Sequence, residues 1–103
     1  ACVVMTIVED IPGGARVVAS EGRLDSATAP TAEIALLPMM GAAARVVLDL
    51  SAVTHISSAG LRILLKAAKQ ARTNGGGFAL AAPQPAVREV LEVSGFDRII
   101  AIH

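Results

Sequence analysis

The sequence has almost no aromatic residues and no net charge. Two of its 103 residues are phenylalanine, Trp and Tyr are missing, and nine basic residues balance nine acidic ones. Proteins that hold nucleic acid need a positive field and aromatic side chains on which bases stack. The composition therefore argues against direct nucleic-acid binding.

Cysteine, histidine and long apolar runs are also scarce. The single cysteine, Cys2, cannot form a disulfide within the chain, and Cys2, His55 and His103 do not have the spacing of a metal site. We therefore expect no metal, no cofactor, and a reducing compartment, the cytoplasm. The apolar runs are only a few residues long, and the N-terminus lacks the basic-then-apolar order of a signal peptide, so we expect no membrane span.

Hydrophobic residues are plentiful, at 53% of the chain, and predict one compact domain over residues 1–103. The first residue is Ala rather than Met, which suits a trimmed chain or one domain of a longer protein. Short apolar runs alternate with helical periods, a pattern typical of strands joined by crossover helices. The predicted fold is an α/β domain of order ββαβαβαβ with a mixed, mostly parallel sheet.

The strands are predicted from the apolar runs. The first two form a hairpin around Pro12-Gly13-Gly14, and residues 21–25 form a loop. The run from Val46 to Leu50 is nearly all apolar, which is typical of a central strand covered on both faces. The predicted strand ranges are 2–8, 15–20, 46–50, 78–82 and 99–102.

The first predicted helix has proline at both ends. Ser26 or Thr28 caps its start, and Pro30 is tolerated in the opening turn because the N–H groups there have no intrahelical partners. Pro38 should end or kink the helix near Leu37.

The second predicted helix has the clearest period. Its apolar stripe consists of Leu61, Leu64, Leu65 and Ala68, and the glycines after Asn74 end it. Those glycines follow a helix and precede a strand, the reverse of a phosphate-binding loop, so we interpret them as a turn.

The third predicted helix contains Pro85 in its first turn and ends at Gly95. We expect Gly95 in the left-handed conformation just past the helix, with Phe96 packed back on Leu91.

The most informative segment runs from Asp49 to Arg62. It leads from the central strand through a polar loop into the second helix, with Ser57 or Ser58 at the capping position. Simple capping is one interpretation. The other is a phosphorylation switch, because added phosphate would meet free backbone N–H groups and the positive end of the helix dipole.

Four segments make the chain resemble the STAS domains, and most closely the bacterial anti-sigma factor antagonists. The resemblance covers almost the whole chain, and the segments are Gly22-Arg23-Leu24-Asp25, Val47-Leu48-Asp49-Leu50-Ser51, Ile56-Ser57-Ser58-Ala59-Gly60-Leu61-Arg62 and Gly95-Phe96-Asp97.

The resemblance implies a regulatory mechanism. In that family a serine before the helix is phosphorylated by a partner anti-sigma factor that is also a serine kinase. The dephosphorylated form captures that partner and so releases the sigma factor. Ser58 falls on the serine position, and a phosphoserine phosphatase is a further implied partner.

The chain departs from the family pattern beside Ser58. Many members have Asp before the serine and Ser or Thr after it, whereas this chain has Ser57 and Ala59. Ser57 is therefore the second candidate for phosphorylation. Arg62 replaces a residue that is often small, and we hypothesise that its guanidinium partly offsets the phosphate charge.

Asp25 matches an acidic residue that the family places on the loop beside the serine. It belongs either to the partner surface or to a turn, and the sequence leaves both open. The stripe of Arg62, Lys66 and Lys69 is either a contact for an acidic partner or a solvated helix face. The predicted partner-binding residues are Asp25, Ser57, Ser58, Ala59, Gly60, Leu61 and Arg62.

The leading hypothesis is thus a binding module, an anti-sigma factor antagonist, and not an enzyme. One alternative is an accessory STAS domain of an anion transporter or of a lipid-transport complex. A serine hydrolase that uses His55 as the base for Ser57 or Ser58 is the weakest, because the sequence specifies neither an orienting acid nor an oxyanion hole.

Overall fold

The structure, a computed structural model, describes residues 3–11, 14–40 and 45–103. Five strands form one sheet in chain order: β1 (Val3–Asp10), β2 (Ala15–Leu24), β3 (Arg45–Ile56), β4 (Gly77–Ala81) and β5 (Ala101–Ile102). β1 runs antiparallel to β2, and the other neighbouring pairs are parallel. The predicted strand and helix order and the mixed, mostly parallel sheet are confirmed.

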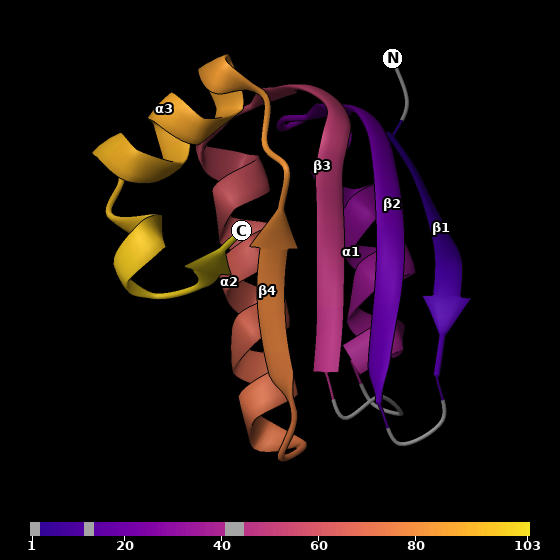
Figure 1. Ribbon diagram of the computed structural model, residues 1–103. Coiled ribbons are helices and arrows are strands. Elements are labelled where there is room, and N and C mark those ends of the chain that lie inside the picture. The colour runs from indigo at the N-terminus through magenta and orange to yellow at the C-terminus, as the bar shows by residue number, and fades with distance from the viewer. Residues whose placement is uncertain (1–2, 12–13, 41–44) are drawn as a thin grey trace.

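Three α-helices connect the strands: α1 (Ala29–Leu36), α2 (Ser58–Thr73) and α3 (Pro85–Val93). Two short 3-10 helices follow α1 and α3, namely η1 (Leu37–Met40) and η2 (Phe96–Arg98). Figure 1 shows α1 and α2 behind the sheet, so the face toward the viewer carries no helix. In the described part of the chain no helix is long and apolar enough to span a membrane.

The core lies between the sheet and the helices. Val46, Leu48 and Leu50 alternate along β3 and are almost fully buried, because every second side chain of a strand points to the same face. From the other side α2 contributes Ile63 and Ala67, which lie one helical turn apart. This layer fixes α2, and therefore its first residues, against the centre of the sheet.

Two predicted loops are strand instead. β2 continues from Ser20 to Leu24 and β3 from Leu50 to Ile56, so the predicted loops at residues 21–25 and between Asp49 and Ser57 are largely wrong. The two extensions pair with each other as far as Leu24 and Ile56. Two register shifts interrupt the pairing, and Gly22, which adopts a φ of 100°, lies beside the second.

Other boundaries shift by a few residues. The last strand begins at Ala101, so the predicted start at Ile99 is wrong. The N–H group of Ile100 still donates to the Phe96 carbonyl, a turn contact that follows η2 and delays the strand. α1 does end at Leu36, before Pro38, as predicted. Gly95 has a φ of 79°, which confirms the left-handed position. Cys2 and two turn residues, Pro12 and Gly13, lie outside the described residues.

Gly60 allows α2 to approach the end of β2. A Cβ atom at this residue would lie 2.5 Å from the carbonyl oxygen of Leu24 and 2.9 Å from its Cβ. Both obstacles belong to a buried residue, and one is backbone, so neither can move cheaply. Only glycine fits between the first turn of α2 and β2.

We expect Gly60→Ala to lower the free energy of unfolding by about 1–3 kcal/mol, the usual cost of overpacking. Gly77→Ala is the matched control, because the nearest atom to a Cβ there is Arg45 Cγ at 4.0 Å. Chemical denaturation of both variants measures the difference. Equal stability of the two variants would contradict the close approach.

Candidate partner-binding site at the start of α2

The two candidate serines occupy different environments. Ser57 is the N-cap residue of α2, with extended backbone, and Ser58 is the first residue of the helix. The Ser57 N–H donates to the Leu24 carbonyl over 2.9 Å, and the Ser57 carbonyl accepts from Leu61 N–H over 2.9 Å. These backbone contacts hold the strand end and the helix start together.

The Ser57 hydroxyl makes no capping hydrogen bond, contrary to the expectation of simple capping. Its Oγ is buried and has no hydrogen-bond partner among the described residues. Ser58, in contrast, is exposed. Of the two hydroxyls, the one on Ser58 is therefore the one that an enzyme can reach.

Asp25 is built into the turn between β2 and α1. Its Oδ1 accepts hydrogen bonds from the N–H groups of Ala27 (3.0 Å) and Thr28 (3.2 Å). Thr28 is the N-cap of α1, but its hydroxyl donates to the Arg23 carbonyl over 2.7 Å and accepts from Asp25 N–H over 3.0 Å. Thr28 therefore occupies the predicted cap position, but its side chain makes no capping hydrogen bond. The turn role of Asp25 is present.

The Asp25 carboxylate also pairs with Arg23 Nε over 3.1 Å. This hydrogen bond lowers the pKa of Asp25 most, and the N–H groups of Thr28 and Ala27 act in the same direction. The side chain is still 18% exposed, so a partner can touch it. Asp25 is thus an ionised carboxylate in a fixed orientation.

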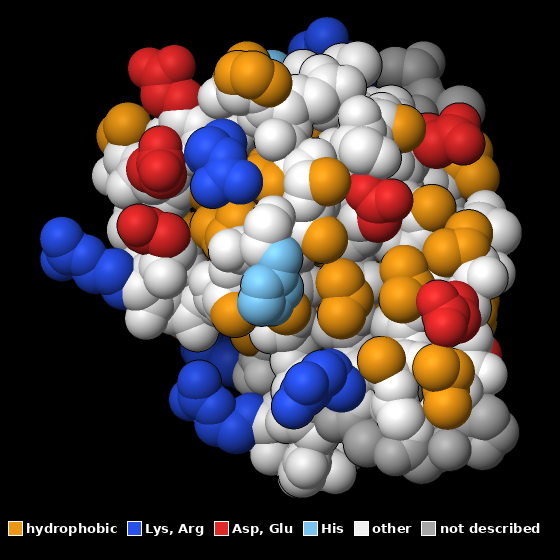
Figure 2. Space-filling model, in the orientation of Figure 1, with side chains coloured by type: hydrophobic (Ala, Val, Ile, Leu, Met, Phe, Trp, Pro, Cys, Tyr) orange, Lys and Arg blue, Asp and Glu red, His pale blue; other side chains and the backbone are white. Residues whose placement is uncertain are grey.

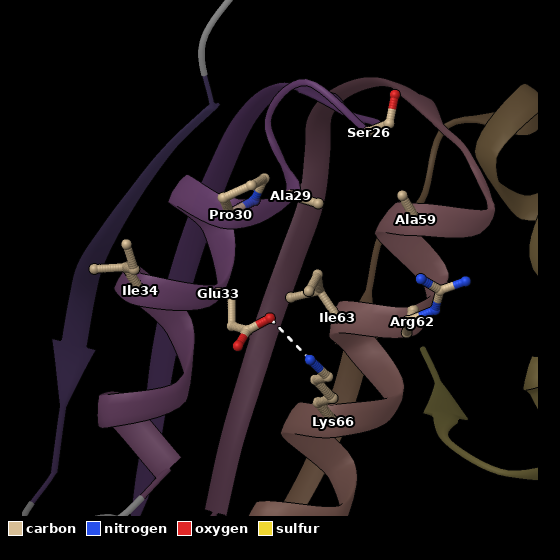
Figure 3. A pocket seen from close by; sticks show the side chains of 9 residues that line it. All are labelled: Ser26, Ala29, Pro30, Glu33, Ile34, Ala59, Arg62, Ile63 and Lys66. Atoms are coloured by element: carbon tan, nitrogen blue, oxygen red, sulfur yellow. Dashed lines mark hydrogen bonds and ion pairs between the residues drawn. The ribbon is translucent and has the colours of Figure 1, made fainter.

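Two grooves flank the first turn of α2. The α1–α2 groove has a volume of about 490 Å³ and runs from Ser26 past Ala59 and Arg62 to the Lys66–Glu33 ion pair, whose atoms are 3.1 Å apart. Figure 3 shows Ile63 and Lys66 on α2 pointing toward α1, where Glu33 meets Lys66, whereas the Arg62 side chain points away from α1.

The α2–α3 groove has a volume of about 390 Å³ and is mostly apolar. Ser58 and Leu61 line it on the α2 side, and Val90 and Val93 on the α3 side. Val93 is 83% exposed, an unusual position for a large apolar side chain. Ser58 therefore lies at the end of a surface that can take an apolar partner segment.

The structure brings together most of the predicted partner-binding residues, but in different ways. Ser58, Ala59, Leu61 and Arg62 line the two grooves, whereas Gly60 is buried and acts through packing. Sequence reasoning missed the groove walls on α1 and α3. Their only signal was an apolar residue at an exposed helix position, as at Ile34, which is 76% exposed.

A serine hydrolase site is not assembled here. Within the described residues no hydrogen bond joins His55 to Ser57 or Ser58; His55 is exposed on β3. The same part of the chain contains no group of three His, Cys, Asp or Glu residues that could hold a metal ion. What the site offers chemically is an exposed hydroxyl, an ionised carboxylate and two grooves.

The fold and this site define a small α/β domain with an exposed serine at the start of its central helix. The chain belongs to the STAS domain family, whose model matches residues 5–103.

Several of its relatives are named as anti-sigma factor antagonists. The chain is 39% identical over 99 residues, 95% of its length, to BtrV of Bordetella bronchiseptica, a candidate anti-sigma factor antagonist by name, of which it covers 85%. An anti-sigma factor antagonist from Mycobacterium paratuberculosis has a similar structure, with a TM-score of 0.84 and 30% identity over 98% of this chain and 85% of that one. The fold also matches phosphorylated SpoIIAA of Bacillus, with a TM-score of 0.70 and 18% identity over 97% of this chain and 91% of that one.

The unbonded Ser57 hydroxyl leads to a stability prediction. Replacing a capping serine by alanine ordinarily costs about 1 kcal/mol, but Ser57→Ala loses no capping bond and removes a buried unpaired hydroxyl. We expect an unchanged or increased free energy of unfolding. In the control, Thr28→Ala, two hydrogen bonds are lost and stability should fall by about 1–2 kcal/mol. A similar loss in Ser57→Ala would show that the hydroxyl is bonded after all.

The Asp25–Arg23 pair leads to a pH prediction. Asp25 should titrate below its ordinary pKa of 3.8, and Arg23→Gln should move its pKa back toward that value. A lowered pKa contributes stability that is present above 3.8 and is lost as the pH falls through the folded value. The stability difference between wild type and Arg23→Gln should therefore close on acidification. NMR titration of the Asp25 carboxyl checks this, and a pKa unaffected by the substitution would contradict it.

Proposed function

We propose that this protein is an anti-sigma factor antagonist controlled by phosphorylation of Ser58. The unphosphorylated form binds an anti-sigma factor that is also a serine kinase, and the sigma factor is released. Phosphate on Ser58 ends that binding, and a phosphoserine phosphatase restores it. The protein acts in the cytoplasm as a binding module and not as an enzyme. The observation that carries the proposal is the exposed Ser58 hydroxyl at the end of the α2–α3 groove.

The names of the relatives support the class of partner. BtrV and the Mycobacterium paratuberculosis protein are both described as antagonists of anti-sigma factors. SpoIIAA, which shares the fold, has been solved in an unphosphorylated and a phosphorylated form. A protein of this fold can therefore carry phosphate and keep its architecture.

The start of α2 suits a phosphorylated serine. A phosphoserine carries nearly two negative charges at neutral pH, and a helix N-terminus stabilises negative charge through its free N–H groups and its dipole. The first turn of α2 contains no acidic residue that would repel the phosphate. Arg62, which is exposed one turn further on, adds a positive charge on the same helix. Modification of Ser58 should therefore cost the fold little.

The same phosphate is costly in an interface. Ser58 lies between residues that line the two grooves, so a bound partner would cover it. Burying the charge would require its desolvation, and acidic groups of the partner would be repelled. A penalty of about 3 kcal/mol weakens binding more than a hundredfold, which is sufficient for a switch.

The test measures binding of the cognate anti-sigma factor to the wild type, Ser58→Ala and Ser58→Asp. We expect Ser58→Ala to bind about as well as the wild type and Ser58→Asp to bind at least about tenfold more weakly, because one carboxylate carries less charge than phosphate. Isothermal titration calorimetry gives the three dissociation constants.

Thr73→Asp is the matched control, because it adds the same charge at the opposite, exposed end of α2. It should leave the affinity unchanged. Equal affinity of Ser58→Asp and the wild type would overturn the charge-block mechanism. Phosphopeptide mass spectrometry after incubation with the kinase and ATP should find the phosphate on Ser58, and phosphate on Ser57 would refute the assignment.

A further inference from the structure

The sheet face opposite α1 and α2 has no covering layer in the described part of the chain. Figure 2 shows this face with hydrophobic side chains spread across it and charged side chains between them. Its residues alternate with the buried ones, so that Val17 on β2 and Val47 on β3 point outward while Val18 and Val46 point into the core. The outward face of the sheet is thus only partly exposed: Val17 and Val47 are half-buried by their neighbours, and Ala79 is 7% exposed.

A row of small and β-branched side chains crosses the middle of this face. Val17 is paired with Val47, Val47 with Ala79, and Ala79 with Ala101. None of these four residues is charged, but on β1 the row ends at Glu9, which is paired with Val17 and is exposed. A flat apolar row without long side chains is suited to face-to-face packing against a second sheet.

The charges beside this row are arranged symmetrically about Val47. Arg45 lies two residues before Val47 on β3 and Asp49 two residues after it, so all three point to the uncovered face. Neither Arg45 nor Asp49 forms a salt bridge with any residue that the structure describes. Among the described residues the Asp49 carboxylate accepts one hydrogen bond, from Ser51 N–H over 2.8 Å.

Arg45 also borders a hollow in this face. The hollow has a volume of about 270 Å³, and Ala79, Ala101 and His103 line its other side. A carboxylate that enters it would meet the Arg45 guanidinium at its rim. Asp49 lies on the same face but outside the hollow, so a carboxylate of this kind is available from another molecule of the same chain.

We propose that two copies of this protein associate through the uncovered sheet faces. The two-fold axis lies in the plane between the two sheets, crosses the strands at right angles and passes beside Val47. Rotation about this axis places Val47 against Val47 of the second copy. It also places Asp49 of each copy over Arg45 of the other, which makes two identical ion pairs. At the β1 edge the same rotation sets Glu9 of one copy opposite Glu9 of the other, a repulsion that weakens the dimer. Such an interface is isologous, the usual form of a symmetric dimer.

The dimensions of the face indicate a reversible dimer. Pairing of β3 with both β2 and β4 covers the five residues from Arg45 to Asp49, so five strands about 4.8 Å apart give a face of roughly 400 Å². This area is below the ~800 Å² per partner of a standard stable interface, so we expect a weak dimer that forms only at high protein concentration. Ser58 begins a helix on the opposite face, so the dimer leaves the proposed switch uncovered and does not depend on it.

The experiment is sedimentation equilibrium of the full chain between about 10 μM and about 1 mM. Arg45→Glu would set two acidic side chains against each other at both contacts, and Asp49→Arg would set two basic ones against each other. The repulsion should weaken the dimer of each variant at least about tenfold. An equimolar mixture of the two variants restores opposite charges at both contacts and should dimerise as the wild type does. Arg98→Glu, a charge reversal on η2 outside the sheet, should change nothing.

The mixture also distinguishes a lost ion pair from a loss of folding stability. A variant that is only less stable would not associate more strongly when the other variant is added. Val47→Lys should leave only monomer. A wild type that remains monomeric at 1 mM would overturn the proposal, as would a mixture that associates no better than its components. Ser58→Asp should dimerise like the wild type, so failure here and failure of the proposed function are distinguishable.

Discussion

The contact between Gly60 and Leu24 is the constraint on which the site depends. The Leu24 carbonyl accepts the Ser57 N–H at 2.9 Å and leaves no room for a Cβ at Gly60. The hydrogen bond and the close packing together fix the first turn of α2 against the end of β2. Asp25 follows Leu24 directly, so this one contact also places the fixed carboxylate beside the helix that carries Ser58.

The position before Ser58 shows how a change of residue alters the electrostatics of a site without altering its backbone. An aspartate at residue 57 would bring a negative charge and a strong capping group to the start of α2. Ser57 brings neither, because its hydroxyl is buried and unbonded. At the end of β2 the Asp25 carboxylate is held by the turn, and Arg23 offsets its charge. Beside Ser58 the groove residues Arg62 and Glu89 also carry opposite charges, so a phosphate on Ser58 would add nearly two negative charges to a surface whose charges are otherwise balanced.

The parts of the fold that could be predicted from the sequence are those with a regular period. The stripe of α2 repeats at helical spacing and gives the helix and its end within a residue or two. β3 is different, since its buried residues lie two apart as far as Leu50 and then three apart, at Val53 and Ile56. The register shifts against β2 cause that change, and they depend on a second strand that local patterning does not reveal. The grooves beside Ser58 were missed for the same reason, because they exist only after α1 and α3 pack beside α2.

The two proposed binding surfaces, one beside Ser58 and one around Val47, follow from one feature, a sheet with helices on a single face. Strand residues that are apolar on both sides usually indicate a sheet covered on both sides. Here the outward side chains are alanine and valine rather than leucine or isoleucine, which limits the apolar area exposed and lets the domain remain folded with one face open. The helical face carries the serine and the grooves, and the open face carries Val47 with its flanking charges. A partner on one face need not displace a second copy on the other, so two serines could be presented together on one dimer.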